Sequence, residues 1–235
     1  MKTYFSHRNI IIAFSFFSLG LTSCDKKDDL PTIRDIDGNM YHYVTIGSQM
    51  WLVENLKTTH FLNGDPIPIV MDKDSWKVLE TGAYCFYDND SLNVSEYGYL
   101  YNWHAVNDSR GLAPSGWRIA TIDDWRTLID YLGGELISSG KLKEKGTAHW
   151  DKPNEGASNE FGFTALPGGF RDYIGNFYHQ GYDGIWWSST SYDDITAWFV
   201  RMNAETISIG IGYAGRKKEG MAIRCVKDKD NPLKK

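Results

Sequence analysis

Residues 161–202 constrain the fold more than any other part of the chain. Three apolar runs with the composition of strands, at 163–166, 185–190 and 197–202, alternate with glycine-rich and Asp/Ser-rich connections. Neighbouring side chains of a strand point to opposite faces, so the adjacent Trp186 and Trp187 predict a strand with aromatic area on both faces. The stretch therefore predicts the central sheet of one compact domain, with residues 168–184 as a long loop at its rim.

Further strands are predicted on both sides of this stretch. In residues 33–53, the dipeptides Asp37-Gly38 and Gly47-Ser48 separate apolar runs and supply the positive φ that tight hairpins need, which favours a β-meander. On the C-terminal side, residues 207–211 and 221–226 alternate apolar and other residues as strands do. The last of these runs would close the sheet.

One principal helix is predicted after Thr121, whose hydroxyl can cap it. Apolar residues then recur at spacings of three and four as far as Leu132, and Gly133-Gly134 follows at the position that favours a left-handed cap. Residues 140–145 predict a second, shorter helix. No linker divides residues 33–226, so the sequence predicts a single α+β domain.

Composition and motifs limit the classes of partner and cofactor that the protein is expected to bind. The chain of 235 residues holds 9 Trp, 14 Tyr and 11 Phe, enough large rings for a core with some left for a surface. A net charge of -5 argues against a nucleic-acid partner, which would need a basic face. The histidines are scattered, and neither a His-Glu-x-x-His motif nor a paired-cysteine spacing is present. We therefore predict no metal, no cofactor and no catalytic residue.

The first 23 residues predict a lipoprotein signal peptide. Lys2 and Arg8 form a positive segment before an apolar run at 10–21. This run is too short to span a bilayer but typical of a signal-peptide core. The run ends in Leu-Thr-Ser-Cys at 21–24, which resembles a lipobox, so Cys24 is predicted to carry the lipid. The alternative is an ordinary cleaved signal in which Cys24 is incidental.

Polar segments lie at both ends of the predicted domain. Residues 24–32, the lipidated cysteine with the polar run after it, predict a flexible tether, and residues 229–235 predict a charged, frayed tail. The lysine and acids directly after Cys24 resemble the surface-export signal of Bacteroidetes lipoproteins. We expect an outer-membrane lipoprotein, exposed at the surface and held to the membrane only through its N-terminal lipid.

Cys85 and Cys225 remain once Cys24 is set aside. In an oxidising compartment they predict a disulfide. Such a bridge would close a loop of about 140 residues, for which chain entropy suggests a stabilisation of roughly 4–5 kcal/mol at most. The alternative is two buried free thiols.

Eight short segments resemble the Fibrobacter succinogenes major paralogous domain, a family common in surface proteins of Bacteroidetes and their relatives. They occur in order between residues 33 and 228, so the resemblance covers nearly the whole predicted domain. The segments lie at 51–56, 82–87, 97–103, 112–118, 140–143, 161–169, 186–190 and 223–226.

This resemblance implies a C-type lectin-like fold. Such a fold has one long and one short helix and a curled, mostly antiparallel sheet whose first and last strands meet, and a long loop commonly carries the binding site. Residues 168–184 would be that loop here. Calcium-dependent sugar binders of this fold use a Glu-Pro-Asn or Gln-Pro-Asp loop with a Trp-Asn-Asp strand. The chain has neither motif, so any sugar binding is expected to be metal-free.

The rim loop mixes aromatic rings with hydrogen-bonding groups. Rings stack on the C–H faces of sugars while amides and carboxylates bond the hydroxyls, and rings with polar tips also suit protein partners. The alternative is that these rings pack the loop against its own domain. The candidate ligand-binding residues are Arg171, Asp172, Tyr173, Asn176, Tyr178, His179, Tyr182 and Asp183.

These observations predict a non-catalytic recognition module at the cell surface, whose partner is a glycan or an envelope or host protein. The alternative is a structural component of an envelope or surface assembly. An enzyme is a third possibility, because formylglycine-generating enzymes share the broad fold that the resemblance implies.

Overall fold

The computed structural model describes Met1 and residues 30–228. Residues 30–228 form an α+β domain built on two five-stranded sheets. In spatial order, the first sheet consists of β1 (Thr32–Arg34), β2 (Met40–Ile46), β3 (Gln49–Leu52), β12 (Cys225–Lys227) and β6 (Trp117–Ile119). The second consists of β11 (Gly210–Arg216), β10 (Thr196–Asn203), β9 (Asp183–Ser191), β7 (Gly168–Arg171) and β8 (Phe177–Gln180). A third, two-stranded sheet pairs β4 (Tyr84–Cys85) with β5 (Leu100–Tyr101).

Almost all of this pairing is antiparallel. Strands β1, β2 and β3 form the meander that the turn dipeptides predicted. The last strand, β12, lies between β3 and β6 and so joins the C-terminal end of the domain to its N-terminal meander. Among the strands of residues 30–228, only β7 and β9 pair in parallel, at the single pair Gly169–Gly184. Backbone hydrogen bonds from Trp187 N to Ala222 O (3.0 Å) and from Ser189 N to Ala120 O (3.0 Å) connect β9 to the segments just before β12 and just after β6.

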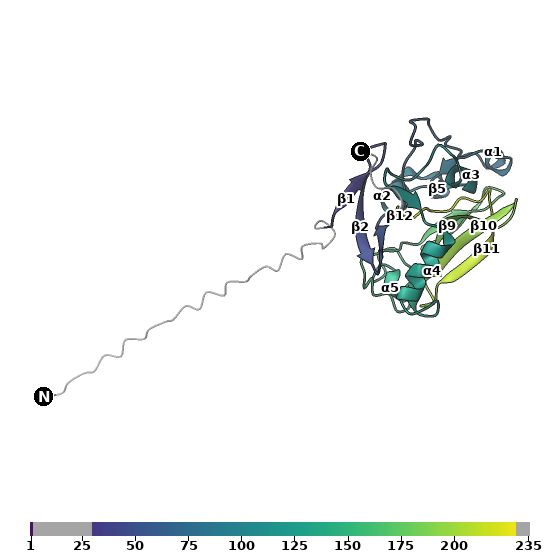
Figure 1. Cartoon of the computed structure of the whole chain (residues 1–235). Coiled ribbons are helices and arrows are strands. Elements are labelled where there is room, and N and C mark those ends of the chain that lie inside the picture. The colour runs from purple at the N-terminus through teal and green to yellow at the C-terminus, as the bar shows by residue number, and fades with distance from the viewer. Residues whose placement is uncertain (2–29, 229–235) are drawn as a thin grey trace.

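The principal helix is α4 (Ile122–Tyr131), which packs beside β9 and β10 (Figure 1). It begins as predicted at Thr121, because the Thr121 hydroxyl accepts from Asp124 N and the Asp124 carboxylate accepts from Thr121 N. The second predicted helix is α5 (Ser138–Leu142), which begins two residues earlier and ends three residues earlier than the predicted segment 140–145.

Several short helices were not predicted. They are too short to show a 3.6-residue period in sequence, and side chains cap the start of three of them, including Asp90, which accepts from Leu92 N. Asp72 accepts from Ser75 N at the start of α1, and Asn102 accepts from Ala105 N at the start of α3. The elements are α1 (Lys73–Lys77), α2 (Val94–Tyr97), α3 (Trp103–Val106) and the 3₁₀ turns η1 (Tyr87–Asn89) and η2 (Ser91–Asn93).

The core lies on both faces of the second sheet. On one face, Trp186 packs with Trp51 and Trp125 between α4 and the first sheet. On the other face, Trp187 packs in a second cluster with Tyr101 and residues of the first sheet. The prediction that the adjacent tryptophans serve opposite faces is confirmed.

Two buried cations hold irregular backbone in place. Arg224 Nη1 donates to the carbonyls of Leu52 and Phe163, each at 2.9 Å, and to that of Val53. Lys143 Nζ donates at 3.0 Å to the carbonyls of Asn203, the last residue of β10, and of Thr206. Burial lowers the pKa of Arg224 to about 9 and that of Lys143 to about 8.

The prediction of a long rim loop at residues 168–184 is wrong. Most of this segment is the hairpin β7–β8, in which Phe170 pairs with Tyr178 and Arg171 with Phe177. Asp172 and Gly175 form the tight turn between the two strands, whereas Gly168 and Gly169 lie within β7 itself. The predicted strand at 163–166 is also absent, apart from the single bridge between Ala165 and Lys143.

The predicted disulfide is not present. Cys85 and Cys225 are both free and buried, which is the alternative left open by the sequence. They belong to different sheets and different hydrophobic clusters, Cys85 on β4 with Trp76 and Leu100, and Cys225 on β12 in the second cluster. Burial raises the pKa of each thiol to about 12, which keeps both protonated and unreactive.

The predicted signal peptide, Cys24, most of the tether and the tail at 229–235 lie outside the described residues. Within residues 30–228, no helix combines the length and the apolar character needed to cross a membrane.

Candidate functional site

The hairpin β7–β8 is held by its own polar residues. Asp172 Oδ1 accepts from the backbone N–H groups of Ile174 (3.0 Å) and Asn176 (2.8 Å), which closes the turn. The Asn176 side chain accepts from Lys73 Nζ at 2.5 Å and so attaches the turn to α1. Two of the predicted ligand-binding residues, Asp172 and Asn176, therefore shape the hairpin.

Arg171 lies in the core and not on a ligand-facing surface. Its side chain is fully buried. The guanidinium donates to the carbonyls of Val70 (2.7 Å) and Met71 (2.8 Å) and lies over the rings of Trp76 and Phe177. Every face of this group is occupied by the protein, so Arg171 fixes the hairpin against the segment before α1.

A hollow of about 290 Å³ lies between the hairpin and strands β9, β10 and β11. We call it the hairpin pocket. It brings together two aromatic rings, a histidine, an arginine and two carboxylates from segments far apart in the sequence. The residues used below are Phe170, His179, Asp183, Phe199, Arg201 and Glu219.

Asp183 is the buried polar centre of the hairpin pocket. Its Oδ1 accepts from Arg201 Nε at 2.7 Å, and its Oδ2 contacts His179 Nδ1 at 2.5 Å. The carboxylate is fully buried, whereas 49% of the His179 side chain and 42% of the Arg201 side chain are exposed. His179 also has a φ of 68°, uncommon for a residue other than glycine. Among the described residues, the Nη groups of Arg201 have no hydrogen-bond partner, so they remain available to a ligand.

Glu219 lines the same pocket from the turn after β11. Burial raises the pKa of its carboxyl group to about 7, and the nearby Asp172 adds to the shift, while Arg216 opposes it. The group therefore changes its charge near neutral pH.

The open space in this pocket depends on small residues in β11. A Cβ at Gly212 would lie 2.2 Å from Phe199 Cζ, and one at Gly215 would lie 2.7 Å from the Trp187 ring. Both rings can therefore lie directly on the β11 backbone only because these positions carry no side chain. The Phe199 ring forms an apolar wall beside the polar groups.

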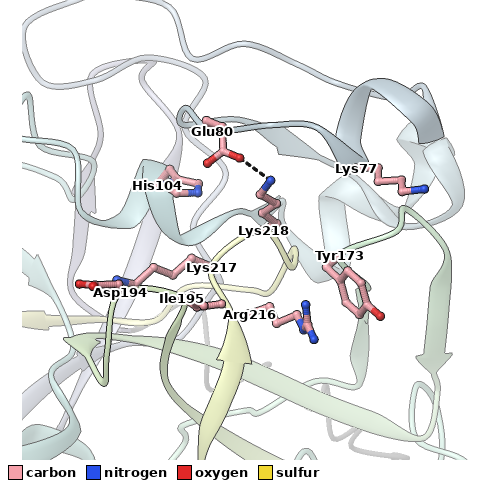
Figure 2. A pocket seen from close by; sticks show the side chains of 9 residues that line it. All are labelled: Lys77, Glu80, His104, Tyr173, Asp194, Ile195, Arg216, Lys217 and Lys218. Atoms are coloured by element: carbon pink, nitrogen blue, oxygen red, sulfur yellow. Dashed lines mark hydrogen bonds and ion pairs between the residues drawn. The ribbon is translucent and has the colours of Figure 1, made fainter.

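A second hollow, of about 370 Å³, lies beyond the hairpin turn (Figure 2). We call it the basic pocket. Segments from α1, α3, the hairpin turn, the β9–β10 turn and the end of β11 enclose it. Figure 2 shows Lys218 paired with Glu80, at an Nζ–Oε1 distance of 2.5 Å, and Arg216 beside the Tyr173 ring. The cations in its lining are Lys77, Arg216, Lys217 and Lys218.

The predicted site residues thus divide between several positions. His179 and Asp183 line the hairpin pocket, and Tyr173 lines the basic pocket. Tyr178 is exposed and packs against Phe170. Tyr182 packs against the first core cluster, and the neighbouring Glu205 carboxylate raises the pKa of its hydroxyl.

Several lining residues were not predicted from the sequence. Phe199 and Arg201 lie on β10, and Glu219 follows β11, so strand pairing brings them to the hairpin. One sequence signal was available, because Arg216-Lys217-Lys218 is a basic run in a chain of net charge -5. Within residues 30–228, no group of three or more His, Cys, Asp and Glu side chains is placed to hold a metal ion.

A family model described as the Fibrobacter succinogenes major domain matches residues 44–227. The chain belongs to this family. The resemblance drawn from the eight short segments is therefore confirmed. In this member of the Fibrobacter succinogenes major domain family, the matched region runs from β2 to the end of β12 and contains the residues that line both pockets. Comparison with curated proteins and with solved structures returns no match.

Proposed function

We propose that this protein is a non-catalytic recognition module that binds a glycan in the hairpin pocket. The observation that carries the proposal is the pairing of ring faces with fixed hydrogen-bonding groups. Phe170 and Phe199 supply apolar walls, and the buried Asp183 orients His179 and Arg201 beside them. A sugar ring presents both a C–H face and hydroxyl groups, so it matches such a surface.

The polar groups of the pocket are already oriented before a ligand binds. Asp183 holds His179 Nδ1 and Arg201 Nε, so ordering these two side chains would add little to the entropic cost of binding. Arg201 retains donors for a ligand hydroxyl, and Glu219 supplies an acceptor or, when protonated, a donor.

The proposal also covers where the protein is located and which α+β fold it has. We infer an outer-membrane lipoprotein anchored through Cys24 and exposed at the cell surface, supported by the lipobox-like sequence at 21–24. Replacing Cys24 with alanine should then move the protein out of the membrane fraction. We also infer a C-type lectin-like fold, supported by the position of β12 next to the N-terminal meander and by the pair of helices α4 and α5.

A glycan array probed with the full chain tests the proposed function. Ala214 is exposed and lines the pocket, so Ala214→Trp should fill the space without disturbing the core. We expect wild-type protein and Ala214→Ser to bind the same glycans, with and without a chelator, and Ala214→Trp to lose them. Binding that Ala214→Trp retains, or binding lost with the chelator, would contradict the proposal.

A structural role in a surface assembly is the second candidate. The observation that favours it is an aromatic cluster in which the exposed Tyr192 and Tyr213 pack against the half-buried Trp198, with ring centroids 4.8–5.7 Å apart. Exposed rings of this kind also serve protein interfaces. This candidate predicts an empty glycan array and an envelope protein crosslinked to photoreactive groups placed at Tyr192 or Tyr213.

A further inference from the structure

The basic pocket concentrates positive charge on a chain whose net charge is -5. Four cations line it against two carboxylates, those of Glu80 and Asp194 (Figure 2). A hollow lined by one sign of charge focuses the electrostatic field and raises the local concentration of oppositely charged ligands. The pocket therefore favours anions over neutral molecules.

Two of these cations already interact with other groups of the protein. Lys218 pairs with Glu80, and Lys217 Nζ donates to Asp193 O at 2.6 Å while lying over the Trp103 ring. Lys77 and Arg216 are different, because within residues 30–228 neither forms an ion pair with a carboxylate. Their charges are available to a ligand.

Arg216 is nevertheless held in place. Its guanidinium carbon lies 4.2 Å from the centre of the Tyr173 ring. The neighbouring Lys217 backbone is also fixed, since Lys217 N donates to Ile195 O at 2.9 Å and Lys217 O accepts from Trp103 N at 2.8 Å. A preorganised guanidinium is suited to bidentate recognition of a planar or tetrahedral anion.

His104 adds an unsatisfied polar group to the same hollow. Its Nε2 atom is buried and has no hydrogen-bond partner among the described residues. Burial lowers the pKa of His104, and Lys217 and Lys218 lower it further although Glu80 opposes them, so the ring is neutral near pH 7. Buried polar atoms are rarely left unpaired, and a ligand hydroxyl would complete this one.

We propose that the basic pocket is a second binding site, whose ligand is an acidic saccharide carrying a carboxylate or sulfate group. Arg216 and Lys77 would bind the anionic group, and His104 would bond a hydroxyl. The Tyr173 ring and Ile195 supply apolar surface beside these polar groups. The inference goes beyond the function proposed above and does not require a ligand in the hairpin pocket.

The shape of the site favours a saccharide over an acidic peptide. Five separate segments enclose a hollow of about 370 Å³, near the lower end of the range for small-molecule pockets. A peptide bound in extended form needs a groove or an open strand edge, whereas one or two sugar rings fit a compact hollow.

Isothermal titration of the full chain with paired saccharides tests the inference. The probes are uronate, sialate and sulfated oligosaccharides, each with its neutral counterpart, together with inorganic sulfate and phosphate. The site variant is Arg216→Met combined with Lys77→Met. The control combines Arg126→Met with Lys145→Met, because Arg126 also lies over an aromatic ring and Lys145 is also exposed. Both double variants change the net charge equally.

We expect at least one acidic saccharide to bind more tightly than its neutral counterpart, and the site variant to weaken it by about tenfold or more per charge removed. The control should keep wild-type affinity, and added salt should weaken binding. Neutral glycans that enter the hairpin pocket should be unaffected, which separates the two proposals.

Three results would overturn the inference. One is that no acidic saccharide binds, and another is that the control loses as much affinity as the site variant. The third is that inorganic sulfate or phosphate binds as tightly as any saccharide, which would assign the pocket to a free anion. Saturable binding of a poly-glutamate peptide with no acidic saccharide bound would assign it to an acidic protein segment instead.

Discussion

Arg224 shows how one side chain can satisfy the backbone of two segments in this protein. It is buried directly before β12 and donates to four carbonyls in two separate segments, at 52–53 and 163–164, while its guanidinium lies 4.4 Å from the centre of the Phe163 ring. Phe163 belongs to the segment that lacks regular strand pairing. The arginine therefore satisfies carbonyls that no sheet partner reaches.

Replacing Arg224 with methionine should lower the free energy of unfolding by at least about 3 kcal/mol. The methionine keeps most of the side-chain volume but leaves several buried carbonyls without a donor, and each unmet group costs about 1–3 kcal/mol. Urea denaturation measures the change. Arg126→Met, which removes an exposed arginine that lies over Trp198, is the control and should cost less than about 1 kcal/mol. A small change in Arg224→Met would mean that the carbonyls find other partners.

The raised pKa of Glu219 predicts that the stability of the protein depends on pH. Its pKa is raised from 4.5 to about 7 in the folded state, so between these values the folded chain holds a proton that the unfolded chain has released. The free energy of unfolding should therefore fall as the pH rises from 4.5 to 7, by about 1–3 kcal/mol from this group.

Glu219→Gln is the matching variant for that measurement. As the pH rises from 4 to 8, the free energy of unfolding of this variant, measured by urea denaturation, should increase by about 1–3 kcal/mol relative to that of wild type. The reason is that glutamine does not ionise. A difference between the two proteins that stays constant with pH would show that Glu219 titrates at its usual value.

At the residue scale, some residues of the site could be identified from the sequence, but the contacts between their side chains could not. His179 and Asp183 were predicted, and Arg201 was not, although Arg201 is the partner of the Asp183 carboxylate. The pairing depends on the register of β9 with β10, which places Asn203 opposite Asp183 and Arg201 opposite Ile185. No local pattern specifies such a register from one sequence.

The hairpin β7–β8 is the element on which the candidate site depends. Two tyrosines in and beside it have different surroundings, since Tyr178 is exposed and Tyr182 packs against the first core cluster. From the sequence alone, both were predicted to be ligand-facing rings.

Tyr178→Ala should change the free energy of unfolding by less than about 1 kcal/mol, and Tyr182→Ala should lower it by about 1–2 kcal/mol more. The difference is expected because removing the Tyr182 ring leaves a gap beside the core. Parallel thermal or urea denaturation of the two variants measures the difference. Equal losses would mean that the hairpin packs through both rings alike.

Elements with strong local signals were predicted well. The capping box of α4 and the adjacent tryptophans of β9 carry their information within a few residues. The hairpin was missed because Gly168, Gly169 and Gly175 raise the glycine content of a segment whose pairing is set by Asp172 and by distant contacts of Arg171. The short helices were missed because none spans two turns.

At the scale of the whole molecule, the fold holds its two described cysteines apart as buried thiols. The sequence predicted a disulfide from their number and from the expected compartment, but a disulfide also requires that the two Cβ atoms meet. Cys85 on β4 and Cys225 on β12 lie in separate clusters. Cysteine counting carries no information about that separation.

Thiol titration in denaturant, without reductant, tests this directly. In the Cys24→Ser variant of the full chain, we expect two reactive thiols, and the same number after reduction. A result of no thiols before reduction and two afterwards would restore the predicted bridge between Cys85 and Cys225.

The α+β class and the family could be predicted from the sequence, because many weak patterns agree over the matched region. The division of the candidate site into two pockets was not available. It arises because β11 lies at the edge of the second sheet and its end separates the hairpin pocket from the basic pocket.

An NMR titration of the full chain, with the neutral oligosaccharide that it retains most strongly on the array, would locate the glycan site residue by residue. We predict shifts confined to the hairpin pocket, at Phe170, His179, Phe199, Ala214 and Glu219, and their loss in Ala214→Trp. Shifts centred on Tyr192 and Tyr213, or spread over no pocket, would contradict the assignment of the hairpin pocket as the glycan site.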